Sequence, residues 1–238
     1  MISVGIVNFN KDNAIPIKLV TKLANMGYAV YMIHYYDDYI NIIEKMEEIK
    51  YWFFSGSDYM PNLKSSPQMN EKILKIKGKK FMMICYSMEI FAKLLGCTLK
   101  QHDKNQQTTS SFDDAFLNKQ INAWRNHKFY LPVSNTQDKM NLLGSFKDEV
   151  MTAKYEDKSE FLLVQWHPPY TEDGELLLDW PRPKIITENG WYPSYRFHQP
   201  DLERSLRHKL KKFDKVFCLQ NCEVFKTVNL KNFTEVHY

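Results

Sequence analysis

The chain has 238 residues, of which 44% are hydrophobic, enough for one large domain or one domain with an appendage. Its 32 basic and 28 acidic residues give a formal net charge of +4, which is too near balance to indicate a nucleic-acid or membrane partner. No apolar run reaches the roughly 18 residues of a membrane span, and the N-terminus lacks the layout of a signal peptide, so we expect a cytoplasmic protein.

The first part of the sequence alternates between strand and helix patterns. Short apolar runs predict strands, and each is followed by apolar residues at helical spacing. Such alternation predicts the α/β class, with a three-layer, mostly parallel sheet covered by helices on both faces. The predicted strands cover residues 2–8, 28–34, 49–54 and 80–84, and the predicted helices cover residues 14–27, 37–48, 69–77 and the segment after Cys85.

The pattern weakens after residue 100. We expect a polar loop over residues 101–111 and short strands or a hairpin within residues 112–134. A strand-like run over residues 161–166 then ends abruptly in His167 and two prolines.

The end of the chain differs in character from the part before it. Residues 176–238 are rich in Trp, Tyr and Phe, too rich for a disordered tail. We therefore predict a C-terminal extension packed against a domain formed by residues 1–175. Within the extension we expect a helix over residues 201–213, followed by strand-forming residues.

Four cysteines are few for a chain of this length, so we expect no disulfide framework. Cys218 and Cys222 stand four residues apart, but no paired motif or close histidine accompanies them. We interpret them as small buried side chains and predict no metal site.

Cys85 stands where a predicted strand passes directly into a predicted helix. A cysteine in such a place is more often a buried small side chain, but a tight strand-to-helix turn would expose it, and the helix N-terminus favours a thiolate. Two further strands end in Ser55-Gly56-Ser57 and in His167. Because the carboxyl ends of parallel strands share one sheet edge, we predict that a nucleophile, a base and an oxyanion-binding turn meet there.

The order of these motifs resembles the class I glutamine amidotransferase family, including its gamma-glutamyl hydrolase relatives, over residues 1–175. The resemblance implies a flavodoxin-like glutamine amidotransferase domain that acts on a small gamma-glutamyl substrate without a cofactor or a metal. It implies that Cys85 attacks the gamma-carbonyl group and that His167, in a Gln-Trp-His-Pro segment, is the base. Free ammonia would pass to a synthase partner, where one exists.

The same resemblance implies the substrate contacts. Backbone N–H groups at Gly56, Ser57 and Tyr86 would hold the oxyanion, whatever their side chains. Glu89 replaces the family's glutamine, as in the gamma-glutamyl hydrolases, and either binds a substrate amine or favours the first helical turn. His127, in Asn-His-Lys-Phe, resembles a substrate-contacting residue; the alternative is a solvated loop histidine.

The sequence also departs from the family pattern. Met83 and Ser87 replace both glycines of the elbow, and Pro169 replaces the acid that follows His-Pro, with Glu172 the nearest substitute. The leading hypothesis is a gamma-glutamyl amide hydrolase. The alternatives are an inactive binding or assembly module that contacts its partner through the extension, and the chemistry of related peptidase or chaperone folds, against which the Gln-Trp-His-Pro segment argues.

Overall fold

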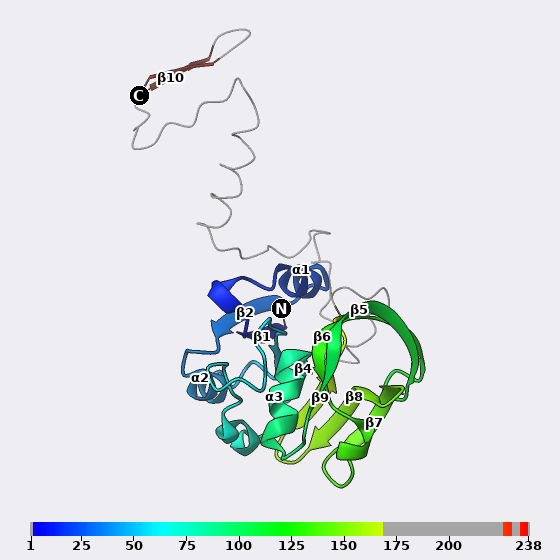
Figure 1. Cartoon of the computed structure of the whole chain (residues 1–238). Helices are drawn as coiled ribbons and strands as arrows, with labels where there is room; N and C mark the ends of the chain where they lie inside the picture. The colour runs from blue at the N-terminus through cyan, green and yellow to red at the C-terminus, as the bar shows by residue number, and fades with distance from the viewer. Residues whose placement is uncertain (1, 169–225, 230–233, 238) are drawn as a thin grey trace. The chain divides into compact units, whose positions relative to one another are not determined.

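The computed structural model describes residues 2–168, 226–229 and 234–237 (Figure 1). The chain divides into two units, residues 1–195 and 196–238, and each is described by itself. In the second unit, strands β10 (Lys226–Asn229) and β11 (Thr234–His237) pair in an antiparallel hairpin. The predicted boundary at residue 175, the predicted helix over residues 201–213 and both C-terminal cysteines lie outside the described residues.

The first half of the sheet is parallel, as the strand and helix alternation predicts. Its five strands are ordered β2-β1-β3-β4-β9, and every neighbouring pair in that order is parallel. These strands confirm the five sequence predictions: β1 (Ser3–Asn8), β2 (Ala29–His34), β3 (Tyr51–Phe54), β4 (Lys80–Ile84) and β9 (Glu160–Val164).

Three α-helices lie within the described residues: α1 (Ile17–Asn25), α2 (Tyr39–Lys45) and α3 (Tyr86–Leu94). Leu19 and Leu23 of α1 join one hydrophobic cluster on the sheet, whereas α2 and α3 contribute Ile43 and Phe91 to another. In the part of the chain that the structure describes, no helix is long and apolar enough to cross a membrane.

The predicted helix over residues 69–77 is wrong in kind, because only a 3-10 turn, η2 (Glu71–Lys75), forms there. The Asn70 side chain accepts a hydrogen bond from the Lys72 amide at its start, and Ile76 returns to an extended backbone at its end. Five residues between these two limits leave no room for several α-helical turns. Two other short 3-10 turns are η1 (Lys11–Asn13) and η3 (Val133–Asn135).

The second half of the sheet is antiparallel, so the expected mostly parallel sheet is corrected to a mixed sheet of nine strands among the described residues. Beyond β9 the order continues β8-β7-β5-β6. Short turns join β7 to β8 and β8 to β9, and a connection of that length permits only antiparallel pairing. The added strands are β5 (Lys100–Asp114), β6 (Lys119–Tyr130), β7 (Asn141–Phe146) and β8 (Glu149–Glu156).

The expected loop over residues 101–111 is also wrong, because these residues belong to the long, curved strand β5 (Figure 1). Most of their polar side chains are exposed, so the sequence shows no apolar alternation until Ser110, Phe112 and Asp114 become buried. Backbone pairing with β6 at Gln101 and from Gln106 onward holds these residues in a strand without an apolar face. The hairpin expected within residues 112–134 is confirmed as the end of β5 and the whole of β6.

Candidate active site

Cys85 lies at a tight elbow between β4 and α3, where the sequence places it. Its backbone has φ 51° and ψ −109°, a conformation that a residue with a side chain adopts only under strain. The Cys85 amide donates to the Val164 carbonyl at 2.7 Å, and the Cys85 carbonyl accepts from the Glu89 amide at 3.0 Å. The end of β9 and the first turn of α3 therefore hold the strained residue from both sides.

Ser87 explains how the elbow forms without the glycine expected at that position. Its buried hydroxyl accepts a hydrogen bond from the Ile84 amide at 2.9 Å and lies 2.8 Å from the Phe54 carbonyl, to which it can donate. The side chain therefore ties the ends of β3 and β4 to the start of α3. Met83, which replaces the other glycine, is fully buried in the core.

The structure brings Cys85 and His167 together at Gly56. A Cβ atom added at Gly56 would lie 3.4 Å from Cε1 of His167 and 3.5 Å from Cβ of Cys85. These residues follow β3, β4 and β9, so three strand ends converge at one sheet edge. The turn is anchored by Ser55, whose hydroxyl accepts from the Phe9 amide at 2.8 Å. Gly56 therefore lies beside both Cys85 and His167.

Strand β6 lies over this convergence, which the sequence does not predict. The His167 amide donates to the Trp124 carbonyl at 2.9 Å. The Cys85 thiol lies 3.7 Å from the Asn126 carbonyl, within sulfur hydrogen-bond reach. The imidazole of His167 also bonds to the Asn126 backbone, an interaction that raises its pKa. The backbone of one residue thus contacts both groups of the candidate pair.

Burial sets the protonation of both groups. Burial raises the pKa of the Cys85 thiol well above its usual value, and the charge of Glu89 adds to the rise, while bonds from the Tyr86 amide and Gln165 oppose it. Burial lowers the pKa of His167 to about 4. At neutral pH the pair is therefore a neutral thiol and a neutral imidazole. Burial therefore opposes the thiolate that the helix N-terminus favours.

Glu89 lies inside the protein at 3% exposure. Its Oε1 accepts a hydrogen bond at 2.9 Å from Nε2 of Gln165, which also lies 3.8 Å from Sγ of Cys85. Burial raises the pKa of Glu89 to about 8, so it is mostly protonated at neutral pH. Both expected roles of Glu89 stay predictions; in the structure its carboxyl group binds Gln165.

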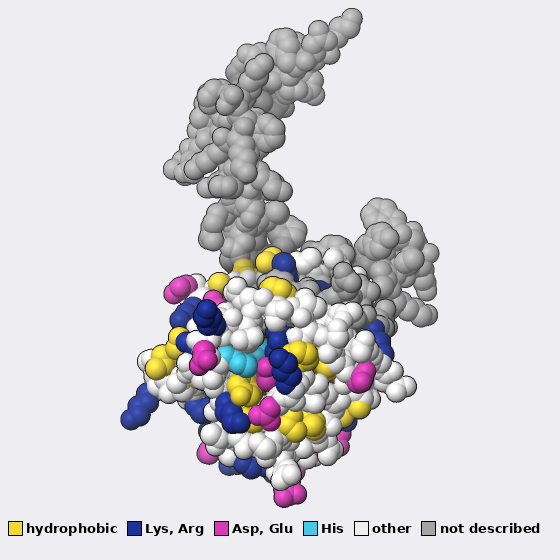
Figure 2. Space-filling model, turned by 45° about the vertical axis from the view of Figure 1, so that its right-hand side comes forward, with side chains coloured by type: hydrophobic (Ala, Val, Ile, Leu, Met, Phe, Trp, Pro, Cys, Tyr) yellow, Lys and Arg dark blue, Asp and Glu magenta, His cyan; other side chains and the backbone are white. Residues whose placement is uncertain are grey.

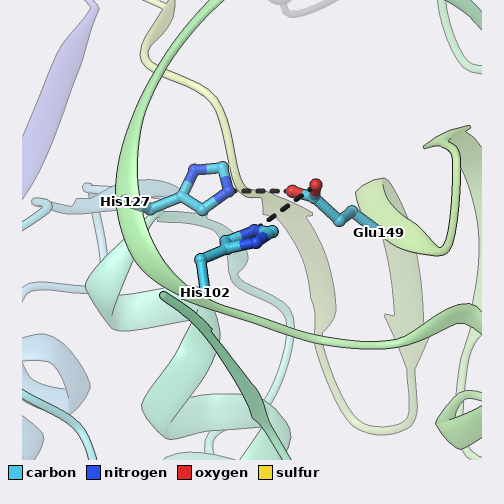
Figure 3. Close-up of side chains that lie close together, drawn as sticks. All are labelled: His102, His127 and Glu149. Carbon is cyan, nitrogen blue, oxygen red and sulfur yellow. Dashed lines mark hydrogen bonds and ion pairs between the residues drawn. The ribbon is translucent and has the colours of Figure 1, made fainter. Parts of the chain in front are cut away.

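His127 is neither in a loop nor solvated, because it lies on β6 with its side chain 1% exposed. Its Nε2 lies 2.9 Å from Oε2 of Glu149, and Nε2 of His102 lies 3.4 Å from Oε1 (Figure 3). Nη1 of Arg125 donates to both carboxylate oxygens, at 3.1 and 2.9 Å. We call His102, Arg125, His127 and Glu149 the Glu149 cluster.

The Glu149 cluster offers three donor groups that could hold a metal ion, with their ligand atoms within 4.8 Å of one another. However, Arg125 already gives the carboxylate a positive partner, and a divalent ion there would lie beside a guanidinium group. Burial opposes ionisation of Glu149, but its bond to His127 and the charge of Arg125 prevail and lower its pKa to about 2. We therefore interpret the cluster as an ion-paired network.

The cluster approaches the surface through His102, whose side chain is 19% exposed. On one face of the molecule, histidine is visible between basic and acidic side chains (Figure 2).

The other expected site residues fall in different places. The Tyr86 amide bonds to the Cys85 sulfur, and the Tyr86 hydroxyl donates to the Pro67 carbonyl. Ser57 accepts a hydrogen bond from the Tyr59 amide at 3.2 Å. Glu172 lies outside the described residues. Sequence reasoning missed the Asn126 carbonyl and Glu149, because a backbone group has no sequence signature and Glu149 lies far along the chain from Cys85.

The fold and the elbow define an α/β protein with a cysteine at a strand-to-helix turn, beside a glycine turn and a histidine. Residues 11–175 match the sequence model of Glutamine amidotransferase class-I. The chain belongs to this family.

Solved structures show the same fold. One is a Thermoplasma acidophilum protein described as part of a GMP synthase, 14% identical, with a TM-score of 0.57 over 74% of this chain and 89% of that chain. Another is SMU.1228c, also 14% identical, with a TM-score of 0.53 over 88% of this chain and 98% of that chain. No curated protein matches the sequence significantly.

Proposed function

We propose that the chain hydrolyses a gamma-glutamyl amide, either glutamine or a gamma-glutamyl conjugate, through a thioester on Cys85. The observation that carries the proposal is the convergence of Cys85 and His167 on Gly56. Membership of the class I glutamine amidotransferase family supports the choice of a gamma-glutamyl substrate.

The reaction starts from the neutral pair. His167 takes the proton of the Cys85 thiol as the sulfur attacks the gamma-carbonyl carbon. Backbone N–H groups at Gly56, Ser57 and Tyr86 hold the resulting oxyanion. The tetrahedral species collapses, the C–N bond breaks, and the imidazolium gives its proton to the leaving amine. Water, deprotonated by His167, then attacks the thioester, which releases glutamate and restores the thiol.

A neutral group orients the imidazole in this proposal. The acid that follows His-Pro in the family is Pro169 here, and the bond from His167 to the Asn126 backbone offers a replacement. An acceptor on one ring nitrogen fixes the tautomer and leaves the other nitrogen to act as the base. Glu172 stays a prediction for the same role.

We also propose a partner that uses the released ammonia. The Thermoplasma protein with the same fold is described as belonging to a GMP synthase, which supports a synthase partner for this chain. Hydrolysis without a partner predicts the same glutamate release but no ammonia transfer. Transfer of the glutamine amide nitrogen to an acceptor, measured with and without a co-purifying synthase, separates the two cases.

The pH dependence follows from the lowered pKa of His167. The base must be unprotonated, so kcat/KM for glutamate release is expected to rise as the pH passes through about 4 and to stay level through neutral pH. A histidine with the ordinary pKa of 6.5 would place this rise more than two pH units higher. Initial rates between about pH 3.5 and 8, on enzyme shown to remain folded, check the prediction; a midpoint near 6.5 would contradict it.

Labelling by a glutamine-like electrophile tests the nucleophile directly. The wild-type chain is expected to take up one equivalent on the peptide that contains Cys85, as mass spectrometry would show, and Cys85→Ala to take up none. Cys97→Ala is the matched control, because Cys97 is also buried, and it should label like the wild type. Absence of labelling together with absence of glutamate release from a panel of gamma-glutamyl amides would favour the inactive binding module.

A further inference from the structure

The Asn126 carbonyl lies at the edge of β6 that faces away from β5. Successive residues of an antiparallel strand direct their backbone groups alternately toward and away from the neighbouring strand. β6 is the last strand of its sheet, and β5 pairs with its other edge. The carbonyls of Trp124 and Asn126, two residues apart, both face the site, where they contact His167 and Cys85. This edge therefore contacts both reacting residues.

The side chains of Arg125 and His127, on either side of Asn126, bind the same carboxylate. Arg125 and His127 are two residues apart, so their side chains share one face of β6, and both are buried. Each binds Glu149, Arg125 through both oxygens and His127 through Oε2 (Figure 3 shows the His127 contact). The residues on either side of Asn126 are thus both bound to the Glu149 carboxylate.

Glu149 is itself fixed to the chain that follows β6. It is the first residue of β8, and it forms a backbone bridge with Pro132. The next residue, Val150, donates its amide to the Leu131 carbonyl at 2.9 Å. Backbone contacts therefore fix the residue whose carboxylate binds the middle of β6.

We propose that Glu149 is a positioning residue that holds the Asn126 carbonyl against Cys85 and His167 through Arg125 and His127. This proposal rests on the proposed function for its catalytic meaning. In this proposal Glu149 takes over the orienting role of the acid that Pro169 replaces, and it does so through the backbone of β6.

The charges around the pair separate this role from a direct electrostatic one. The charged and titratable groups that act on His167 are His127 from β6 and Asp58 from the turn after β3; those that act on Cys85 are Glu89 from α3 and Asp58. Glu149 is not among them. Its removal should therefore change both groups of the pair by moving β6 and admitting water. Loss of its effect on the pKa of His127 would act on His167 and leave the reactivity of Cys85 unchanged.

The test compares Glu149→Gln with Asp148→Asn in the full chain. Asp148 precedes Glu149, carries the same charge and pairs with Lys100 at the surface, with its side chain 52% exposed. In Glu149→Gln the pKa of His167, followed by NMR titration, is expected to rise by about one unit or more, since burial is the main cause of its low value. Alkylation of Cys85 by iodoacetamide is expected to accelerate about tenfold or more as β6 opens locally. Asp148→Asn should change neither quantity.

Glu149→Asp withdraws the same charge by one methylene group and should give smaller changes in the same directions, which provides a second variant if Glu149→Gln does not fold. Wild-type values in both Glu149 variants, or equal changes in Asp148→Asn, would overturn the proposal. So would binding of one Zn²⁺ per wild-type chain that His102→Ala abolishes, because it would assign the cluster to a metal. Neither the NMR titration nor the alkylation requires turnover. Failure of the proposed function would therefore be detected separately, by the electrophile labelling.

Discussion

Replacement of Cys85 by Ala is expected to lower glutamate release from glutamine by at least about 10³-fold. The thiol is the only nucleophile that the proposal places at the elbow, and no thioester can form without it. Backbone donors and substrate binding survive the change, so a trace of activity above solution hydrolysis can remain. The side chain is small and buried, so the variant should keep its fold.

Three further variants sharpen this prediction. Cys97→Ala should retain wild-type kcat/KM, because Cys97 is tied by its amide to Ala92 at the end of α3 and lies outside the proposed site. His167→Ala should lose nearly as much activity as Cys85→Ala, and the double variant little more than either, because the two residues act as one unit. Glutamate release by folded Cys85→Ala at the wild-type rate would refute the mechanism.

The elbow could be predicted because its sequence signal is local. Apolar residues change from a continuous run to helical spacing at Cys85, and a strand that passes straight into a helix leaves one residue at the turn. The same reasoning placed Gly56 and His167 at one sheet edge, since parallel strands end together. These predictions needed only strand ends and the rule of sheet direction.

Strand β5 and the contacts of β6 with the site could not be predicted in this way. Strand β5 carries polar residues on its exposed positions, so its sequence is typical of a loop, and only pairing with β6 makes it a strand. The contact between Asn126 and the candidate pair is made by a carbonyl, which every residue has. Glu149 reaches the site through two side chains of another strand. Each of these features depends on tertiary packing.

Burial also opposes the ionisation of Cys85 that its place at a helix N-terminus predicts. A cysteine at a helix N-terminus is expected to ionise more easily, but burial of the Cys85 thiol acts in the opposite direction and is the largest cause of its raised pKa. Burial lowers the pKa of the His167 imidazole, whereas it raises the pKa of the thiol. In the proposed reaction, proton transfer from Cys85 to His167 therefore accompanies attack, which makes the position of the Asn126 carbonyl important.

The largest expected effect on stability is at Gly5, in the middle of β1. Gly5 pairs with Tyr31 on one side and Trp52 on the other, and a Cβ atom there would lie 2.1 Å from Cε3 and 2.3 Å from Cζ3 of the Trp52 ring. The ring is fully buried in the core and cannot swing into solvent. Gly5→Ala is expected to destabilise the fold by about 3 kcal/mol or more, and to lower Tm by roughly 10 °C.

The cause of this loss can be isolated in a double-mutant cycle with Trp52→Leu, which removes the ring that the new methyl group would strike. Trp52→Leu alone should also destabilise, because it leaves a cavity and loses the bond from Nε1 to the Ile49 carbonyl. In the double variant the methyl group fills part of that cavity, so the combined loss should fall short of the sum by about 1 kcal/mol or more, measured by urea unfolding. Additive losses would show that Gly5→Ala acts through strand backbone and not through crowding of Trp52.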